Sequence, residues 1–293
     1  MLRRVYVLCS LAVVGMACFP GRLAGQELPY FVTYSHHMEE PGSLDFELKT
    51  ASGRPHEGDT FLGTSLEFEY GTRAWWTTEL YLDGQSTAGE STVFGGFRLE
   101  NRFRPLLGEH RVNPVLYVEF EDINGANKSL LEVVGHDGAA DLVENNRDTH
   151  AEKEREIELK LIFSSNAKGW NFAENVIAEK NLSNDPWEFG YALAASRPLR
   201  LTASGRNCRL CAEDFQLGVE MYGGLGDRYS FGTRDTSHYV APTANWNVPH
   251  GPTLSFSPAF GLNDQSLPHI YRIGISYEPG QVRRWFHARK EGR

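Results

Sequence analysis

The chain has 293 residues and carries 38 acidic against 29 basic side chains, for a formal net charge of −9. An acidic chain is unsuited to binding nucleic acid through a basic face, so the sequence argues against a nucleic-acid partner. The length allows one large β-domain or two ordinary domains.

The first 26 residues have the pattern of an export signal. Two arginines precede an apolar stretch over residues 5–19, and small residues follow around Gly25. The stretch is shorter than the roughly 20 residues that a membrane-spanning helix needs. We therefore expect a cleaved signal peptide over residues 1–26, with a lipid anchor at Cys18 as the alternative.

Residues 27–42 form a lead-in to the first strand and contain the pair His36-His37. Adjacent side chains on an extended chain point in opposite directions, which is poor geometry for holding one metal ion. We expect a periplasmic lead-in that tucks into the mouth of a barrel, and metal binding by the pair stays an alternative.

Apolar and polar residues then alternate along most of the chain. Leu66 and Phe68, for example, alternate with Glu67 and Glu69. A period of two gives each strand one apolar and one polar face. The pattern predicts twelve strands, over residues 43–51, 61–70, 74–83, 94–103, 113–121, 155–164, 170–179, 187–196, 213–223, 238–248, 252–262 and 269–277.

The connections between these strands tend to alternate in length. Residues 71–73, 165–169 and 249–251 are short links, whereas the acidic link 122–154 is long. Outer-membrane barrels have short periplasmic turns, longer external loops and an even number of strands. If the first strand runs outward, the short links and both chain ends lie in the periplasm. Links 105–112 and 197–214 depart from the pattern, because they are long but fall on the short-turn side.

Aromatic residues gather near the strand ends that would face the periplasm, where aromatic rings favour the headgroup level of a membrane. They are Tyr70, Trp75, Trp76, Phe103, Phe163, Phe172, Phe215 and Tyr277.

These features predict an all-β fold: a single closed antiparallel transmembrane β-barrel of about twelve strands over residues 43–277. Closure pairs every backbone group without leaving an edge in lipid. Apolar side chains such as Leu80 and Leu82 would then face lipid. The residues expected to line the lumen are Glu67, Glu69, Glu79, Tyr81, Arg98, Glu100, Arg102, Glu119, Glu121, Glu156, Glu158 and Arg272.

Three stretches, TYSHHMEEPGSLDFELK (33–49), LEFEYGTRAWWTTELYLDGQ (66–85) and YRIGISYEPG (271–280), resemble outer-membrane β-barrel proteins of Gram-negative bacteria. The resemblance is to a channel or transporter-like group and covers most of the mature chain as a pattern. It implies an outer-membrane location and the barrel assembly machinery as a partner, but no particular solute. The chain departs from such barrels after Tyr277, because a basic tail over residues 278–293 follows, which we expect in the periplasm.

Cys208-Arg-Leu-Cys211 is the most specific local motif. We expect a disulfide between Cys208 and Cys211, because exported proteins reach an oxidising compartment. Haem attachment would need His where Ala212 stands, and a zinc site needs about four ligands. A redox-active pair, a metal site with ligands from elsewhere and two free thiols remain alternatives.

The inward charges carry the functional expectation. They either form ion pairs that stiffen the wall or make a charged constriction that selects solutes. We expect a barrel that passes or binds small hydrophilic solutes, with outer-membrane lipid around it. The alternatives are a structural or interaction barrel with a closed lumen and a secreted soluble β-sandwich. No enzyme activity, cofactor or metal is expected, because the histidines are scattered and no Gly-x-Ser-x-Gly motif occurs.

Overall fold

The computed structural model describes residues 28–128, 134–136, 143, 145–183, 185–202, 210–249 and 251–279. The predicted signal peptide, residue 27, Cys208 and all but the first two residues of the basic tail lie outside the described residues. No helix in the described ranges is long and apolar enough to cross a membrane.

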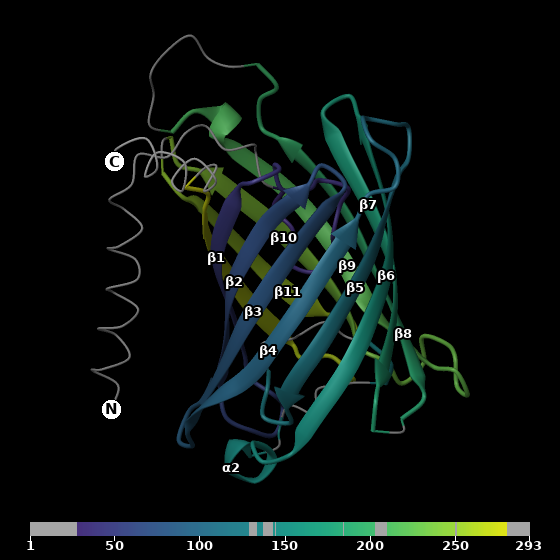
Figure 1. Ribbon diagram of the computed structural model, residues 1–293. Helices are drawn as coiled ribbons and strands as arrows, with labels where there is room; N and C mark the ends of the chain where they lie inside the picture. The colour runs from purple at the N-terminus through teal and green to yellow at the C-terminus, as the bar shows by residue number, and fades with distance from the viewer. Residues whose placement is uncertain are drawn as a thin grey trace, which may run out of the picture.

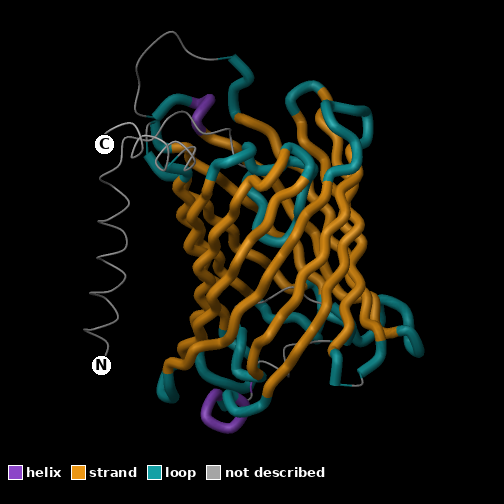
Figure 2. Tube along the Cα trace, in the orientation of Figure 1, coloured by secondary structure: helices purple, strands orange, loops and turns teal. Residues whose placement is uncertain are grey.

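The described residues form twelve antiparallel strands that close into one barrel (Figures 1 and 2). The strands are β1 (Leu44–Gly53), β2 (Phe61–Arg73), β3 (Trp76–Thr87), β4 (Thr92–Phe103), β5 (Asn113–Asn124), β6 (Lys153–Ala167), β7 (Trp170–Asn181), β8 (Trp187–Pro198), β9 (Phe215–Asp227), β10 (His238–Asn247), β11 (Thr253–Gly261) and β12 (His269–Tyr277). Each strand pairs with its neighbours in sequence. The sheet closes where β1 pairs with β12, with Phe46 opposite Tyr277.

The predicted closed barrel is thus confirmed, and all twelve predicted strands overlap observed ones. The β-sandwich alternative is wrong, because a sandwich would leave the first and last strands unpaired with each other. The observed strands are mostly longer than predicted, since they continue into polar residues at their ends.

The barrel presents its apolar side chains outward and its charged side chains inward. On β4, Leu99 is 44 % exposed whereas the neighbouring Glu100 is fully buried. On β12, Ile273 is 52 % exposed whereas Arg272 is 5 % exposed. Successive side chains on a strand face opposite ways. An apolar outer band around a polar interior is the arrangement that suits a barrel surrounded by hydrocarbon.

Aromatic rings cluster at one end of the barrel, where β2 meets β3 and β6 meets β7. Trp75, Trp76 and Phe103 stack on one another, with ring centroids 6.0–6.4 Å apart. Trp170 stacks on Phe172 at the same end. This arrangement agrees with an aromatic belt at a membrane interface. Tyr277 differs from the predicted set, because it is buried.

The two ends of the barrel carry different connections. β6 and β7 are joined by a two-residue turn in which Lys168 and Gly169 both have positive φ, as a tight hairpin requires. The opposite end carries the connection from β5 to β6, with the short helix α2 (Asn146–Thr149), at the bottom of Figure 1. The connection from β8 to β9, with η2 (Ala212–Asp214), is also long but lies at the end of the tight turns.

Candidate functional site

A row of acidic side chains crosses nine neighbouring strands on the inner face of the barrel. Taken from β1 to β9, its members are Asp45, Glu69, Glu79, Glu100, Glu119, Glu158, Glu179, Glu188 and Asp227, each directly opposite the next. Residues directly opposite in an antiparallel pair share one face of the sheet. We call this set the acid row.

The acid row shifts along the barrel axis as it passes from strand to strand. Asp45 is the second residue of β1, whereas Asp227 is the last residue of β9. β1 and β9 run in the same direction, because neighbouring strands are antiparallel throughout. The row therefore begins near one mouth of the barrel and ends at the other.

Arg102 lies beside the first part of the acid row and bridges its members on β2, β3 and β4. Its guanidinium forms ion pairs with Glu69 and Glu79, and its Nε lies 2.8 Å from Oε1 of Glu100. The Tyr81 hydroxyl lies within hydrogen-bond distance of both Glu79 and Glu100, and its single proton can be donated to either. One cation and one hydroxyl therefore hold three neighbouring carboxylates in place.

Arg98 on β4 and Lys160 on β6 also form ion pairs with acidic side chains on the inner face of the barrel. Nε of Arg98 lies 3.0 Å from Oδ2 of Asp83, and its Nη1 lies 3.0 Å from Oε1 of Glu119. Nζ of Lys160 lies 3.0 Å from Oε1 of Glu158. The guanidinium carbon of Arg98 lies 4.1 Å from the ring centroid of Tyr81. Nζ of Lys160 lies 4.6 Å and 4.5 Å from the ring centroids of Tyr34 and Tyr117. Cation–π attraction therefore stabilises both cations.

The structure places the twelve sequence-predicted lumen residues as follows. Ten are buried within the barrel, and Glu69 and Glu156 are half-buried. Most of them join the ion-pair groups around Arg102 and Arg98. Arg272 stands apart from the other cations and donates to the hydroxyl of Tyr222. Whether these groups select a solute stays a prediction.

The predicted list of lumen residues left out several charged residues on the same inner face. They include Asp45, Lys49, Asp83, Lys160, Glu179, Glu188, Glu220 and Asp227. Lys49 lies 2.8 Å from Oε2 of Glu67 and 3.1 Å from Oε2 of Glu47. The same alternation that marked Glu67 would have identified most of these residues, had each strand been followed to its end.

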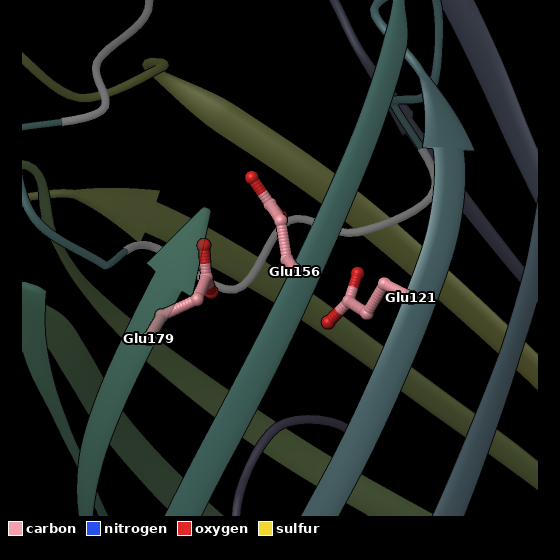
Figure 3. A group of neighbouring side chains, drawn as sticks. All are labelled: Glu121, Glu156 and Glu179. Atoms are coloured by element: carbon pink, nitrogen blue, oxygen red, sulfur yellow. The ribbon is translucent and has the colours of Figure 1, made fainter. Parts of the chain in front are cut away.

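Three carboxylates approach one another where β5, β6 and β7 lie side by side. Ligand atoms of Glu121, Glu156 and Glu179 lie within 4.8 Å of one another, and Figure 3 shows the three side chains on adjacent strands. Asn181 donates to Oε1 of Glu156 at 2.9 Å. Acidic groups often gather in this way without an ion, so the proximity alone assigns no metal site.

The segment before β1 lies inside the barrel. We call residues 28–42 the inner segment. The backbone N–H groups of Phe31, Val32 and Thr33 donate to the carboxylate of Glu220 on β9, at 2.8–3.0 Å. Hydrogen bonds to an ionised acceptor are stronger than neutral ones. Glu220 therefore anchors the innermost part of the segment.

Tyr34 joins the inner segment to the charged part of the wall. Its N–H donates to Oδ1 of Asn175 at 2.7 Å, and the Asn175 amide donates back to its carbonyl oxygen at 2.8 Å. The Tyr34 hydroxyl donates to Oε2 of Glu100 at 3.0 Å and lies 3.2 Å from the Tyr81 hydroxyl. The segment thus contacts both sides of the bore.

The histidine pair belongs to this segment. Nδ1 of His36 forms a hydrogen bond with Ser164, and its Nε2 lies 3.0 Å from Oε2 of Glu109. Burial lowers the pKa of His36 below its ordinary value. Both ring nitrogens of His36 are thus engaged, which does not favour the alternative of a metal held by His36 and His37.

The inner segment leaves the barrel next to Gly71, where the backbone is tightly packed. The Gly42 N–H donates to the Gly71 carbonyl at 2.7 Å, and the Gly71 N–H donates to the Ser43 carbonyl at 3.1 Å. A Cβ at position 71 would lie 2.0 Å from the carbonyl oxygen of Glu40. Only glycine therefore fits this crossing without a backbone shift.

A cavity of about 410 Å³ lies between the inner segment and the inner faces of β1–β4. Its acidic lining residues are Glu39, Glu40, Asp45, Glu47, Glu67, Glu69, Glu79 and Glu278, and its basic ones are His37, Lys49 and Arg102. The Thr33 side chain also lines it. Acids therefore outnumber bases in this cavity.

The opposite mouth is covered in part by residues 134–136. The Gly135 N–H donates to the Phe189 carbonyl at 3.0 Å, and the Gly226 N–H donates to the Gly135 carbonyl at 3.2 Å. Val134 is almost fully buried and belongs to the same apolar cluster as Val32 of the inner segment. Two segments from opposite ends of the barrel thus share one cluster inside it.

The inner faces of β1–β8, which we call the charged wall, differ from those of β10–β12, which we call the neutral wall. Tyr239, Ala241, Ala259 and Ile270 on the neutral wall are buried in the cluster that contains Val32. Within its described residues, the neutral wall has one charged side chain, Arg272. The described part of the lumen is therefore charged on one side and largely uncharged on the other.

The cysteine motif is only partly within the described residues. Cys211 is buried, whereas Cys208 lies outside the described ranges. The disulfide between them stays a prediction.

No family model matches the chain, and no curated protein matches it. Among solved structures, an outer-membrane channel from Pseudomonas putida F1 is similar over 83% of this chain and 97% of that chain, at a TM-score of 0.51 and 14% identity. The NanC porin has a TM-score of 0.46 and 12% identity, over 80% of this chain and 98% of that chain. The translocator domain of the autotransporter NalP from Neisseria meningitidis has a TM-score of 0.46 and 11% identity, over 80% of this chain and 88% of that chain. At such identities the likeness concerns the fold, and the fold of this chain is that of an outer-membrane β-barrel.

Proposed function

We propose that this chain is an outer-membrane channel that passes small hydrophilic solutes along its charged wall. The observation that carries the proposal is the inverted barrel: apolar side chains cover the outside, and buried charges and a cavity occupy the inside. A polar lumen inside a lipid-facing barrel is the arrangement of water-filled channels. The proposal includes no catalytic residue, cofactor or metal.

The proposed location is the outer membrane of a Gram-negative bacterium, with both chain ends in the periplasm. The tight β2–β3 and β6–β7 turns support this orientation, because they lie at the same end as the start of β1 and the end of β12. Outer-membrane lipid and the barrel assembly machinery are the partners that such a location implies. The lead-in and the basic tail would then both begin at the periplasmic mouth.

The inner segment would set the width of the path. Its contacts with Glu220, Asn175 and Glu100 hold it across the bore, and the cavity lies between it and the charged wall. Solutes would therefore pass beside the segment rather than through an empty tube. A barrel of twelve strands is also narrower than porins of 16–18 strands, which leave an aqueous channel.

Conductance of the purified protein in planar lipid bilayers tests the proposal. Two proteins would be compared, the mature chain and a variant that lacks residues 28–40. We expect discrete conductance steps for the mature chain and larger steps for the variant, because removal of the segment widens the bore. Heat-dependent migration in SDS gels would confirm that both proteins are folded barrels. Folded proteins that both fail to conduct would contradict the proposal.

A closed structural barrel is the second candidate, and one observation favours it. The inner segment and residues 134–136 enter from opposite ends and meet in one apolar cluster through Val32 and Val134. If this packing closes the lumen, the folded mature chain will not conduct, whereas the variant lacking residues 28–40 will. The same experiment therefore separates the two candidates.

A further inference from the structure

We propose that the channel selects cations, and that the acid row is the element that selects them. This inference rests on the proposed function, because it names the class of solute that the same lumen passes. The register of the strands places one carboxylate opposite the next across nine strands.

A row of like charges is unfavourable for stability alone. Like charges directly opposite each other on neighbouring strands destabilise a sheet. A wall built only for stiffness would place a base opposite each acid. Here each step of the acid row places an acid opposite an acid, so the row needs an explanation beyond packing.

The bases beside the row are too few to cancel its charge. Arg102 contacts three carboxylates of the row, Arg98 contacts Glu119 of the row and Asp83 outside it, and Lys160 contacts Glu158 of the row. One cation shared among two or three carboxylates leaves a net negative charge even when every carboxylate has a partner. The neutral wall opposite contributes only the charge of Arg272 within its described residues. Among the described residues, the inner face of the barrel therefore carries more acidic than basic side chains.

The cavity at the start of the row has the same sign and contains a polar group that the protein leaves unused. Eight acids and three bases line it. Thr33 lines it as well; the residue is 5 % exposed, and its buried Oγ1 has no hydrogen-bond partner among the described residues. A buried hydroxyl without a partner is unfavourable unless a ligand or water satisfies it. A cavity lined mainly by carboxylates suits a small cation better than an anion.

Continuity is the remaining requirement for a path. The acid row reaches from the second residue of β1 to the last residue of β9, and it includes Asp45, Glu69 and Glu79 of the cavity lining. Rings of acidic side chains are a known basis of cation selectivity in channels. The row therefore places a carboxylate on every strand from the cavity to the far mouth.

The test measures reversal potentials in planar bilayers with a KCl gradient across the membrane. It uses the mature chain, the variant lacking residues 28–40 and the substitution Glu179→Gln in each. Glu174→Gln is the matched control, because Glu174 lies on the same strand but is exposed on the outer face. We expect K⁺ to be preferred over Cl⁻ in both starting proteins. Glu179→Gln should reduce the permeability ratio by about twofold, as expected for one unit charge within ~8 Å of the ion in water. Glu174→Gln should leave the ratio unchanged.

The outcomes separate this inference from the proposed function. Conductance without ion preference, or with a preference for Cl⁻, overturns cation selection while the channel proposal stands. A preference for K⁺ that Glu179→Gln and Glu174→Gln reduce equally overturns the role of the acid row. The absence of conductance in folded protein, with and without residues 28–40, overturns both.

Discussion

The charged wall and the neutral wall face each other across one bore, yet they are filled in different ways. On the charged wall, carboxylates are held by a few shared cations such as Arg102 and Arg98. On the neutral wall, Ala241 and Ile270 pack against Val32. Both walls have the same two-residue period, so the period determines which side chains point inward but not how the interior is filled.

The difference gives the inner segment a defined place. Its apolar residue Val32 packs on the neutral side, whereas the Tyr34 hydroxyl reaches Glu100 on the charged side. A segment with one apolar and one polar side can lie in only one rotational setting in such a bore. The asymmetry of the two walls therefore orients the segment and leaves the cavity next to the acids.

The largest expected effect comes from removing the cation that the charged wall depends on. Arg102→Met leaves Glu69, Glu79 and Glu100 buried without their shared partner. Loss of one member of a buried ion-pair group typically destabilises by about 3–5 kcal/mol. We expect a loss of that size in the free energy of unfolding, measured by urea titration of the barrel in detergent.

Arg272→Met on the neutral wall is the comparison for this prediction. Arg272 donates to the Tyr222 hydroxyl and lies over the Tyr222 ring, 5.1 Å from its centroid. Its removal takes away the bond to the neutral Tyr222 hydroxyl, so we expect a smaller loss. Equal losses for the two variants would contradict the distinction between the walls.

Gly71→Ala tests how the inner segment is held at the mouth. The new Cβ would lie 2.0 Å from the Glu40 carbonyl oxygen, so the segment must shift away from β2. Overpacking of this kind typically costs about 1–3 kcal/mol. We expect faster cleavage of the inner segment by an added protease, with the barrel itself intact.

Gly84→Ala is the matched control. Gly84 lies on the neighbouring strand β3, and the nearest atoms to its added Cβ are 3.9 Å away. The protease should cleave this variant at the rate of the parent chain. If the protease cleaved the inner segment of both variants at the rate of the parent chain, the contact at Gly71 would not be what holds the segment.

Acidification should weaken the binding of the inner segment within the barrel. Burial lowers the pKa of His36, so the released segment binds a proton more readily than the bound one. The stabilisation is complete above the ordinary pKa of His36, near 6.5, and is lost as the pH falls below it. The ratio of bound to released segment should fall by up to about tenfold per pH unit in that window.

The charged groups that face His36 are Glu109, Arg104 and His37. Glu109 favours the protonated form, whereas burial and Arg104 oppose it. Protease cleavage of the inner segment between pH 7 and pH 5 measures the effect. His36→Gln should reduce the pH dependence without abolishing it, because burial also lowers the pKa of His37, to about 4. His110→Gln, at an exposed loop position, should leave the pH profile unchanged. An unchanged profile in His36→Gln would assign the pH dependence to another group.

The barrel was predictable from sequence because each strand carries its own signal. The alternation around Glu67 and Glu100 is local, and it identifies the inward face without knowledge of neighbouring strands. The acid row is different, because it depends on register. Glu119 and Glu158 lie opposite each other only because the connection between β5 and β6 allows that alignment. No local pattern encodes that alignment.

The inner segment was predictable only as a lead-in near the mouth. It has no two-residue period, and its position depends on hydrogen bonds that side chains of distant strands supply. Glu220, which receives three backbone N–H groups, lies in a β9 stretch rich in glycine, where the alternation is weak. A carboxylate at that position gives no sequence signal that its partner is a backbone segment nearly two hundred residues away.

The smallest expected effect compares two tyrosine hydroxyls on the inner segment. The Tyr34 hydroxyl donates to the Glu100 carboxylate on the charged wall, whereas the Tyr30 hydroxyl donates to the Asn171 side-chain oxygen. Hydrogen bonds to charged groups contribute about 1.5–3 kcal/mol and those to neutral groups about 1 kcal/mol. Tyr34→Phe should therefore lower the free energy of releasing the segment more than Tyr30→Phe, by roughly 1 kcal/mol. Protease protection of the segment measures this free energy. The opposite order would mean that the segment is held mainly from its Asn171 end, and that the charged wall contributes little to its binding.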